Sequence, residues 1–126
     1  MNTNAVADAL KILLIAKHPR VYRNAPISNP TFPYVVFNVE NITESFPSED
    51  YYVYVDVFDA PTGSVRQMET IADDIQSIAR TVYRNENLNM QIEKISRQFV
   101  PADDLTSSKM ITMQFNCRVY FIWKEN

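Results

Sequence analysis

The stretch from Ile111 to Trp123, ITMQFNCRVYFIW, decides the fold class. Apolar and more polar residues alternate along it: one set is Ile111, Met113, Phe115, Cys117, Val119, Phe121 and Trp123, and the other is Thr112, Gln114, Asn116, Arg118 and Tyr120. Successive side chains of a β-strand point to opposite faces of the sheet, so this period of two predicts a strand with one buried face. A sheet with one apolar face needs other elements to cover that face.

Two upstream segments show the same kind of pattern. Tyr34–Glu40 and Tyr51–Asp59 are rich in β-branched and aromatic residues, and apolar residues recur at every second position: Val35, Phe37 and Val39 in the first segment, and Val53, Val55 and Val57 in the second. We expect them to form two paired strands. The segment between them, Asn41–Asp50, contains Pro47 and three acidic residues without a basic one, which predicts a solvated loop.

A fourth strand is expected between the turn-like segment Asn85–Asn89 and the last strand. Its apolar residues keep one phase up to Ile92 and take the opposite phase from Ile95 onward, so the pattern slips near Glu93 and Lys94. A β-bulge is the simplest cause of such a slip.

Helical spacing of apolar residues occurs in two places. It runs from Asn4 to Lys17, where Pro19 supplies a stop. A second helix is expected to begin at Ser64, because Ser64 and Gln67 have the spacing of a capping box. Its apolar stripe consists of Val65, Met68, Ile71, Ala72, Ile75, Ile78, Ala79 and Val82.

The order of these elements predicts the fold class. The segment Arg20–Pro33 contains three prolines and is expected to be an extended connection, which leaves the order helix, strand, strand, helix, strand, strand. This order predicts an α+β two-layer sandwich, in which a four-stranded, mainly antiparallel sheet carries both helices on one face. At 126 residues with a hydrophobic share of 46%, the chain is expected to form a single domain over residues 1–126.

Composition excludes several classes of function. Gly63 is the single glycine, whereas nucleotide-phosphate loops need several glycines. The net charge of -3 disfavours non-specific binding to DNA. The apolar run near Leu10 is too short for a membrane span and wrongly flanked for a signal peptide, so we expect synthesis in the cytoplasm and no contact with a membrane.

The residues that could carry chemistry are few. His18 is the only histidine, and a favourable cation at a helix C-terminus is a better interpretation than a catalytic role. Cys117 falls on the apolar side of the last strand, where a thiol is usually a core residue. The carboxylate pairs Glu49-Asp50, Asp73-Asp74 and Asp103-Asp104 are expected to be solvated. We therefore predict no catalytic residue, no cofactor and no metal site.

Two surface features are consistent with contacts between proteins. Tyr34, Tyr52, Tyr54 and Tyr120 fall opposite the apolar face, where they are either ordinary half-exposed residues or part of an interface. Charge is also segregated, since residues 11–23 contain basic residues and no acid while residues 40–59 contain acids and no base. Complementary patches on one subunit suit head-to-tail contacts, although two separate solvated faces would give the same pattern.

The chain resembles the tail terminator, or tail-completion and head-tail joining, proteins of tailed bacteriophages. The likeness covers the whole length and includes "PYVVF" at residues 33–37, "YYVYVDVFD" at residues 51–59 and "ITMQFNCRVYF" at residues 111–121. It implies a virion protein, made in the bacterial cytoplasm, that forms a homohexameric ring on the tail tube and meets the head connector, while DNA passes through the lumen without specific binding. The expected subunit-interface residues are Lys11, Lys17, Arg20, Arg23, Glu44, Glu49, Asp50, Tyr52 and Tyr54.

Two alternatives stay open at this point. One is another neck or connector protein of a phage, which composition cannot separate from a tail terminator. The other is a small cytoplasmic ligand-binding module or enzyme with a pocket between helices and sheet, which is weakened by the lack of a polar constellation.

Overall fold

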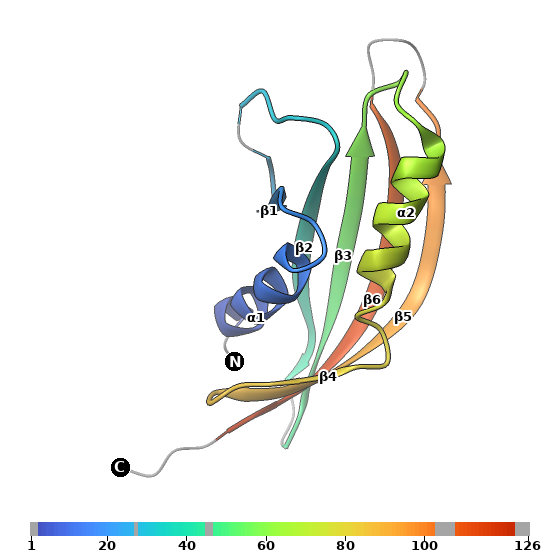
Figure 1. Cartoon of the computed structure of the whole chain (residues 1–126). Coiled ribbons are helices and arrows are strands. Elements are labelled where there is room, and N and C mark those ends of the chain that lie inside the picture. Colours follow the sequence, from blue (N-terminus) through green and yellow to red (C-terminus); the bar gives the residue numbers. More distant parts are fainter. Residues whose placement is uncertain (1–2, 27, 45–46, 103–107, 123–126) are drawn as a thin grey trace.

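The computed structural model describes residues 3–26, 28–44, 47–102 and 108–122 (Figure 1). Along these residues the elements are α1 (Thr3–Ile15), β1 (Val21–Arg23), β2 (Tyr34–Glu44), β3 (Glu49–Asp59), α2 (Val65–Gln76), β4 (Val82–Arg84), β5 (Leu88–Val100) and β6 (Lys109–Phe121). Asp103, Asp104 and Trp123, which entered the sequence analysis, lie outside the described residues.

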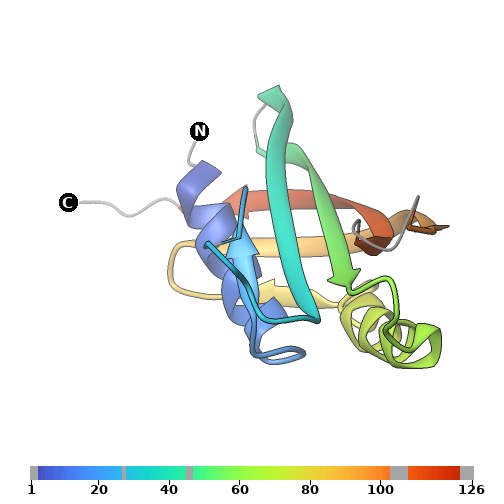
Figure 2. The ribbon, with the colours of Figure 1, turned by 90° about the horizontal axis from the view of Figure 1, so that it is seen from above.

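The sheet has six strands in the order β1-β2-β3-β6-β5-β4, so the prediction of a four-stranded sheet is wrong. β1 pairs with β2 in parallel, and every other neighbouring pair is antiparallel. The sheet is therefore mixed. It is also strongly curled, since β2 and β3 run across the direction of β5 and β6 when the molecule is seen from above (Figure 2).

The two missed strands, β1 and β4, are three residues long and lie at the edges of the sheet. β1 falls in the Pro-rich segment that was expected to be a plain connection. β4 contains Val82, which was expected to extend the apolar stripe of the second helix. That helix ends at Gln76, and Arg80 then adopts a positive φ of 62°, so the chain turns back towards the sheet. A strand of three residues is too short to show a period of two, and this is why the pattern missed both strands.

The prediction of a solvated loop over Asn41–Asp50 is also wrong. β2 continues to Glu44 and β3 begins at Glu49, with Asn41 opposite Tyr51 and a register shift between Asn41 and Thr43. The hairpin is therefore paired for most of this segment. Acidic residues and Pro47 in this segment hid the strand pattern in the sequence.

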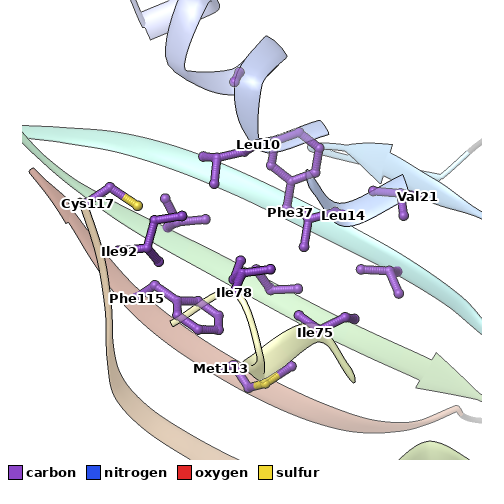
Figure 3. Close-up of a cluster of buried hydrophobic side chains, with 14 of the residues drawn as sticks. Leu10, Leu14, Val21, Phe37, Ile75, Ile78, Ile92, Met113, Phe115 and Cys117 are labelled. Carbon is purple, nitrogen blue, oxygen red and sulfur yellow. The ribbon is translucent and has the colours of Figure 1, made fainter. Parts of the chain in front are cut away.

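One buried cluster joins both helices to the inner face of the sheet. Phe115 of β6 is fully buried and lies near Ile75 of α2 and near Ile78, which follows that helix (Figure 3). Leu10 and Leu14 of α1 cover Phe37 of β2 in the same cluster. Both helices thus contribute to one side of the sheet, and among the described residues no helix covers the other side (Figure 2).

Two local predictions are confirmed. Ser64 is the N-cap of α2, and its side chain accepts a hydrogen bond of 3.2 Å from the Gln67 backbone N–H. The pairing of β5 with β6 shifts register between Lys94 and Ser96, so Ile95 is the extra residue of a bulge.

An ion-pair cluster that the sequence analysis did not identify ties α2 to β5. Arg97 of β5 donates hydrogen bonds to Glu69, to Asp73 at 2.7 Å and to Gln76 at 3.0 Å. These three acceptors lie at intervals of four and three on α2, so they share one side of that helix. One guanidinium therefore contacts two full turns of the helix.

Candidate assembly surface

The uncovered outer face of the sheet carries an aromatic cluster that we call the aromatic row: Tyr22, Phe32, Tyr34 and Phe58. The Tyr34 ring stacks on Phe32 with a centroid distance of 5.4 Å and on Phe58 with one of 5.2 Å. Tyr22 meets the edge of Tyr34 at 6.2 Å. These contacts leave Tyr34 only 8% exposed, whereas Phe32 is 41% exposed. Phe32 is therefore the part of the row that is open to a partner.

Further along the same face lies a more polar group of tyrosines. Tyr52 and Tyr54 alternate with buried valines of β3, so both face outward, and their rings meet edge to face at 6.4 Å. The Tyr54 hydroxyl donates to Glu40 at 3.4 Å. Asp50 accepts a hydrogen bond of 3.3 Å from Arg118 on β6. Aromatic area beside charge-assisted hydrogen bonds is typical of protein interfaces.

Between these two groups, Asp56 lies opposite Val36 on β2 and Thr112 on β6. Burial raises the pKa of the Asp56 carboxyl above its ordinary value, and a hydrogen bond with Thr112 opposes that rise. The outer face therefore contains one partly desolvated carboxylate between the aromatic row and the tyrosines of β3.

The expected basic residues lie around α1 and β1, away from the hairpin end of β2 and β3. Arg20 donates to the Pro33 carbonyl at 2.9 Å, and Arg23 donates to the Asn4 side chain at 2.9 Å. Lys11 is half-buried on α1, and Lys17 is exposed just after it. Part of the expected basic patch thus holds the N-terminal segments together.

The expected acidic residues differ from one another in their surroundings. Glu49 is only 8% exposed and accepts a hydrogen bond of 3.4 Å from the Tyr51 hydroxyl, so it faces the core and is not a surface charge. Asp50 points to the outer face, whereas Glu44 is placed as the last residue of β2. The structure therefore brings Asp50, Tyr52 and Tyr54 together on one face and places the basic residues elsewhere.

The only histidine has a structural contact. His18 is 7% exposed, and its Nε2 lies 3.1 Å from the Pro33 carbonyl oxygen, to which it donates. Burial lowers the pKa of His18, the hydrogen bond to Pro33 opposes this, and the charge of Arg20 adds to the lowering. The expectation of a cation at the end of α1 is therefore wrong, because burial favours the neutral ring.

The thiol of Cys117 is fully buried in the core, and burial raises its pKa to about 12. Such a thiol has almost no thiolate at neutral pH, so the prediction of a core residue is confirmed. In the described part of the chain, no three His, Cys, Asp or Glu residues are grouped so that they could hold a metal ion. A cavity of about 360 Å³ lies at the end of α2, lined by Gln76, Ala79, Arg80, Glu93 and Lys94.

Within the described residues, neither helix has the length and apolar character that crossing a membrane would require.

Comparisons with known proteins show similarity of structure without similarity of sequence. No protein-family model matches the chain, and no curated protein matches it. One similar solved structure is a chain from the virion of a native gene transfer agent particle: the identity is 13%, the TM-score is 0.63, and the match covers 91% of each chain. A second solved protein, whose name gives no function, has 13% identity and a TM-score of 0.66, and the match covers 96% of this chain and 94% of that one. The chain therefore shares the fold of a virion component.

Proposed function

We propose that this protein is a structural component of a virion, in which it forms a homohexameric ring at the head-proximal end of a phage tail. In this role it ends the tail tube and joins it to the head connector. The observation that carries the proposal is the shared fold with a chain of a gene transfer agent virion, which extends over 91% of both chains. The resemblance to tail terminator proteins, noted from the sequence, points to the same class of protein.

The outer face of the sheet supports this role. It presents the exposed Phe32 at one end and Tyr52, Tyr54 and Asp50 further along. A face without a covering helix but with aromatic side chains suits contact with another protein, here the tail tube or the connector. The net charge of -3 would let DNA pass through a ring without sticking to it.

The properties of the two candidate nucleophile and base residues also favour a structural role over an enzymatic one. The buried thiol of Cys117 has a pKa of about 12, and the His18 ring donates a hydrogen bond to the Pro33 carbonyl. A nucleophile is activated by a base within hydrogen-bond reach, but the His18 ring, between α1 and β1, donates to Pro33, and the thiol of Cys117 on β6 is a buried core group.

The test has two parts. Native mass spectrometry of the purified protein at high concentration should show a closed hexamer. Particles made without the gene should carry tubes of irregular, extended length, because nothing then stops the addition of tube subunits. Tails of normal length with detached heads would instead indicate another neck protein. A strict monomer both in solution and in assembled particles would contradict the ring.

A further inference from the structure

The two edges of the sheet are each covered over only part of their length. β1 pairs with β2 at Val35–Phe37, so the described residues provide no strand partner for the segment 38–44 on that side. At the other edge, β4 pairs with β5 at Asn89–Gln91, and the segment 93–100 is open in the same way. We call these segments the open half of β2 and the open half of β5. An open strand edge presents unpaired backbone groups to any partner.

The two edges are stepped in complementary ways (Figure 1). Following the register across the sheet, Val36 is level with Gln98, so β1 lies at the height of the open half of β5. Likewise Thr43 is level with Gln91, so β4 lies at the height of the open half of β2. The short strand at each edge is therefore in register with the open half at the other edge.

We propose that copies of this chain join head to tail through these edges, with β1 of one copy filling the open half of β5 of the next. In the same contact, β4 of that next copy lies against the open half of β2. This inference rests on the ring of the proposed function and names the surface that closes it. The partner is a second copy of the chain, because the short strand that fits the open half at one edge is the one that the same chain has at its other edge.

Strand direction is compatible with this contact. Three successive antiparallel pairings separate β2 from β5, so these two strands run in opposite directions. β1 runs parallel to β2 and hence opposite to β5. If the sheet continues from one copy into the next in the same strand order, β1 meets β5 as an antiparallel partner, which is the stronger type of pairing.

The backbone at both open halves faces outward. Ile92 exchanges hydrogen bonds with Thr81 and Arg80 on the β4 side, at 3.2 Å and 2.5 Å. Alternation along the strand, with one extra residue at Ile95, then directs the backbone N–H of Arg97 and Phe99 to the open side. On β2, the Phe37 carbonyl accepts from the β1 side, so the groups of the following alternate residues face the same way.

Exposed apolar side chains gather at these edges. Among the described residues, nine large hydrophobic side chains are exposed, and four of the nine lie on the two stepped edges: Ile42, Val82, Ile95 and Phe99. Val82 is the most exposed of all nine, at 62%. Burying these side chains between copies would stabilise the contact, and the short edge strands would prevent pairing in other registers.

Cysteine cross-linking tests the contact directly. Tyr22 pairs with Val36 and is therefore level with Gln98, so the double variant Tyr22→Cys, Gln98→Cys should give a disulfide-linked ladder that ends at a closed ring. Each single variant should give no cross-link by itself, and an equimolar mixture of the two should give dimers only. The buried Cys117 stays unreactive. Thermal melts confirm that each variant is folded.

A backbone variant supplies a second, independent reading. Phe99→Pro removes an outward N–H and should weaken association about tenfold, which corresponds to one backbone hydrogen bond. Phe99→Ser is the matched control, because it removes the same side chain but keeps the N–H.

The outcomes separate this inference from the proposed function. Cross-linking of either single variant would show a two-fold contact and overturn the head-to-tail edge. A closed hexamer that yields no cross-link in the double variant would retain the ring and overturn this contact. A ladder from the double variant that closes at another number of subunits would support the contact and contradict the hexamer.

Discussion

At the scale of single residues, the close approach of Asp59 to Gly63 leaves no room for a larger residue at position 63. A Cβ atom added at position 63 would overlap both carboxylate oxygens of Asp59, which is only 4% exposed and accepts a hydrogen bond of 2.8 Å from the Ala60 N–H. The carboxylate cannot move without losing that bond. We expect Gly63→Ala to lower the free energy of unfolding by about 1 to 3 kcal/mol, as overpacking does in other proteins.

Urea unfolding measures this effect, with the exposed neighbour Thr62→Ala as the control, which should stay within about 0.5 kcal/mol of the unchanged protein. Equal stability of Gly63→Ala and the unchanged protein would show that the turn adapts freely.

His18 gives the protein a pH-dependent stability. Burial lowers its pKa in the folded state below the ordinary value of 6.5, so the unfolded chain binds a proton at a higher pH than the folded chain does. The contribution of the neutral ring is complete above pH 6.5 and is lost as the pH falls through and below that value. We expect the free energy of unfolding to drop between pH 7 and pH 5.5, at most about 1.4 kcal/mol per pH unit.

The measurement is a series of urea melts across that range, before the carboxylates titrate. His18→Gln has no titratable ring, so its stability should change less over the same interval. Parallel pH profiles for the two proteins would contradict the assignment.

At the scale of elements, Phe115 connects the clearest strand with the second helix. It is fully buried beside Ile75 and Ile78 (Figure 3). Phe115→Ala removes a ring from a close-packed region and should lower the free energy of unfolding by about 3 to 5 kcal/mol. A loss below about 1 kcal/mol in denaturant melts would mean that the core closes around the cavity.

Arg97 holds the same helix from the side. Its contacts with Glu69 and Asp73 are partly screened, because those carboxylate side chains are 45% and 71% exposed. We therefore expect Arg97→Lys, which keeps the charge but loses the planar fork, to cost only about 1 kcal/mol. The exposed Lys94→Met, three residues away, is the control. Salt should reduce the difference between Arg97→Lys and the unchanged protein, and a difference independent of salt would assign the loss to packing.

The strong patterns predicted their elements correctly, and the weak ones did not. The period of two in β3 and β6 and the cap at Ser64 are local signals, and the structure agrees with them. β1 and β4 have no local signal, because three residues at an edge are fixed by their neighbours in space. The end of α2 was also predicted wrongly, because helical spacing of apolar residues continues past the end of the helix. Ile78 belongs to that spacing and is buried, although it follows α2.

The same contrast holds for the candidate site. Tyr52 and Tyr54 could be placed on one face because the period of two assigns each strand residue to a side, whereas Asp50 was expected in a loop and its place on that face was not predicted. Glu49 was misassigned because its segment was expected to be a loop. Arg97 could not be paired with α2, since residues 24 and 28 positions apart meet only through the packing of the helix on the sheet.

At the scale of the whole molecule, the curl of the sheet divides the surface into parts with different uses. The helices fill the inner side, the edges carry complementary steps, and the outer face carries aromatic side chains. If the edges join copies of the chain, the outer face remains available to proteins of another kind. Self-association and incorporation into a particle should therefore be separable by mutation.

The outer-face tyrosines provide that separation. Tyr52 and Tyr54 are half-exposed, and their mutual contact is worth about 0.5 to 1.5 kcal/mol beyond area burial, so Tyr52→Ser with Tyr54→Ser should leave the protein folded and its native mass unchanged. Incorporation into assembled particles should fall sharply, because the variant removes aromatic area from the face offered to the tail tube or the connector. Quantitative immunoblots of purified particles measure incorporation, and Val65→Ser, which removes an exposed apolar side chain of α2, is the control. Normal incorporation of the double variant would exclude this face from the contact with other virion proteins, whereas loss of self-association would move the contact between copies from the edges to the outer face.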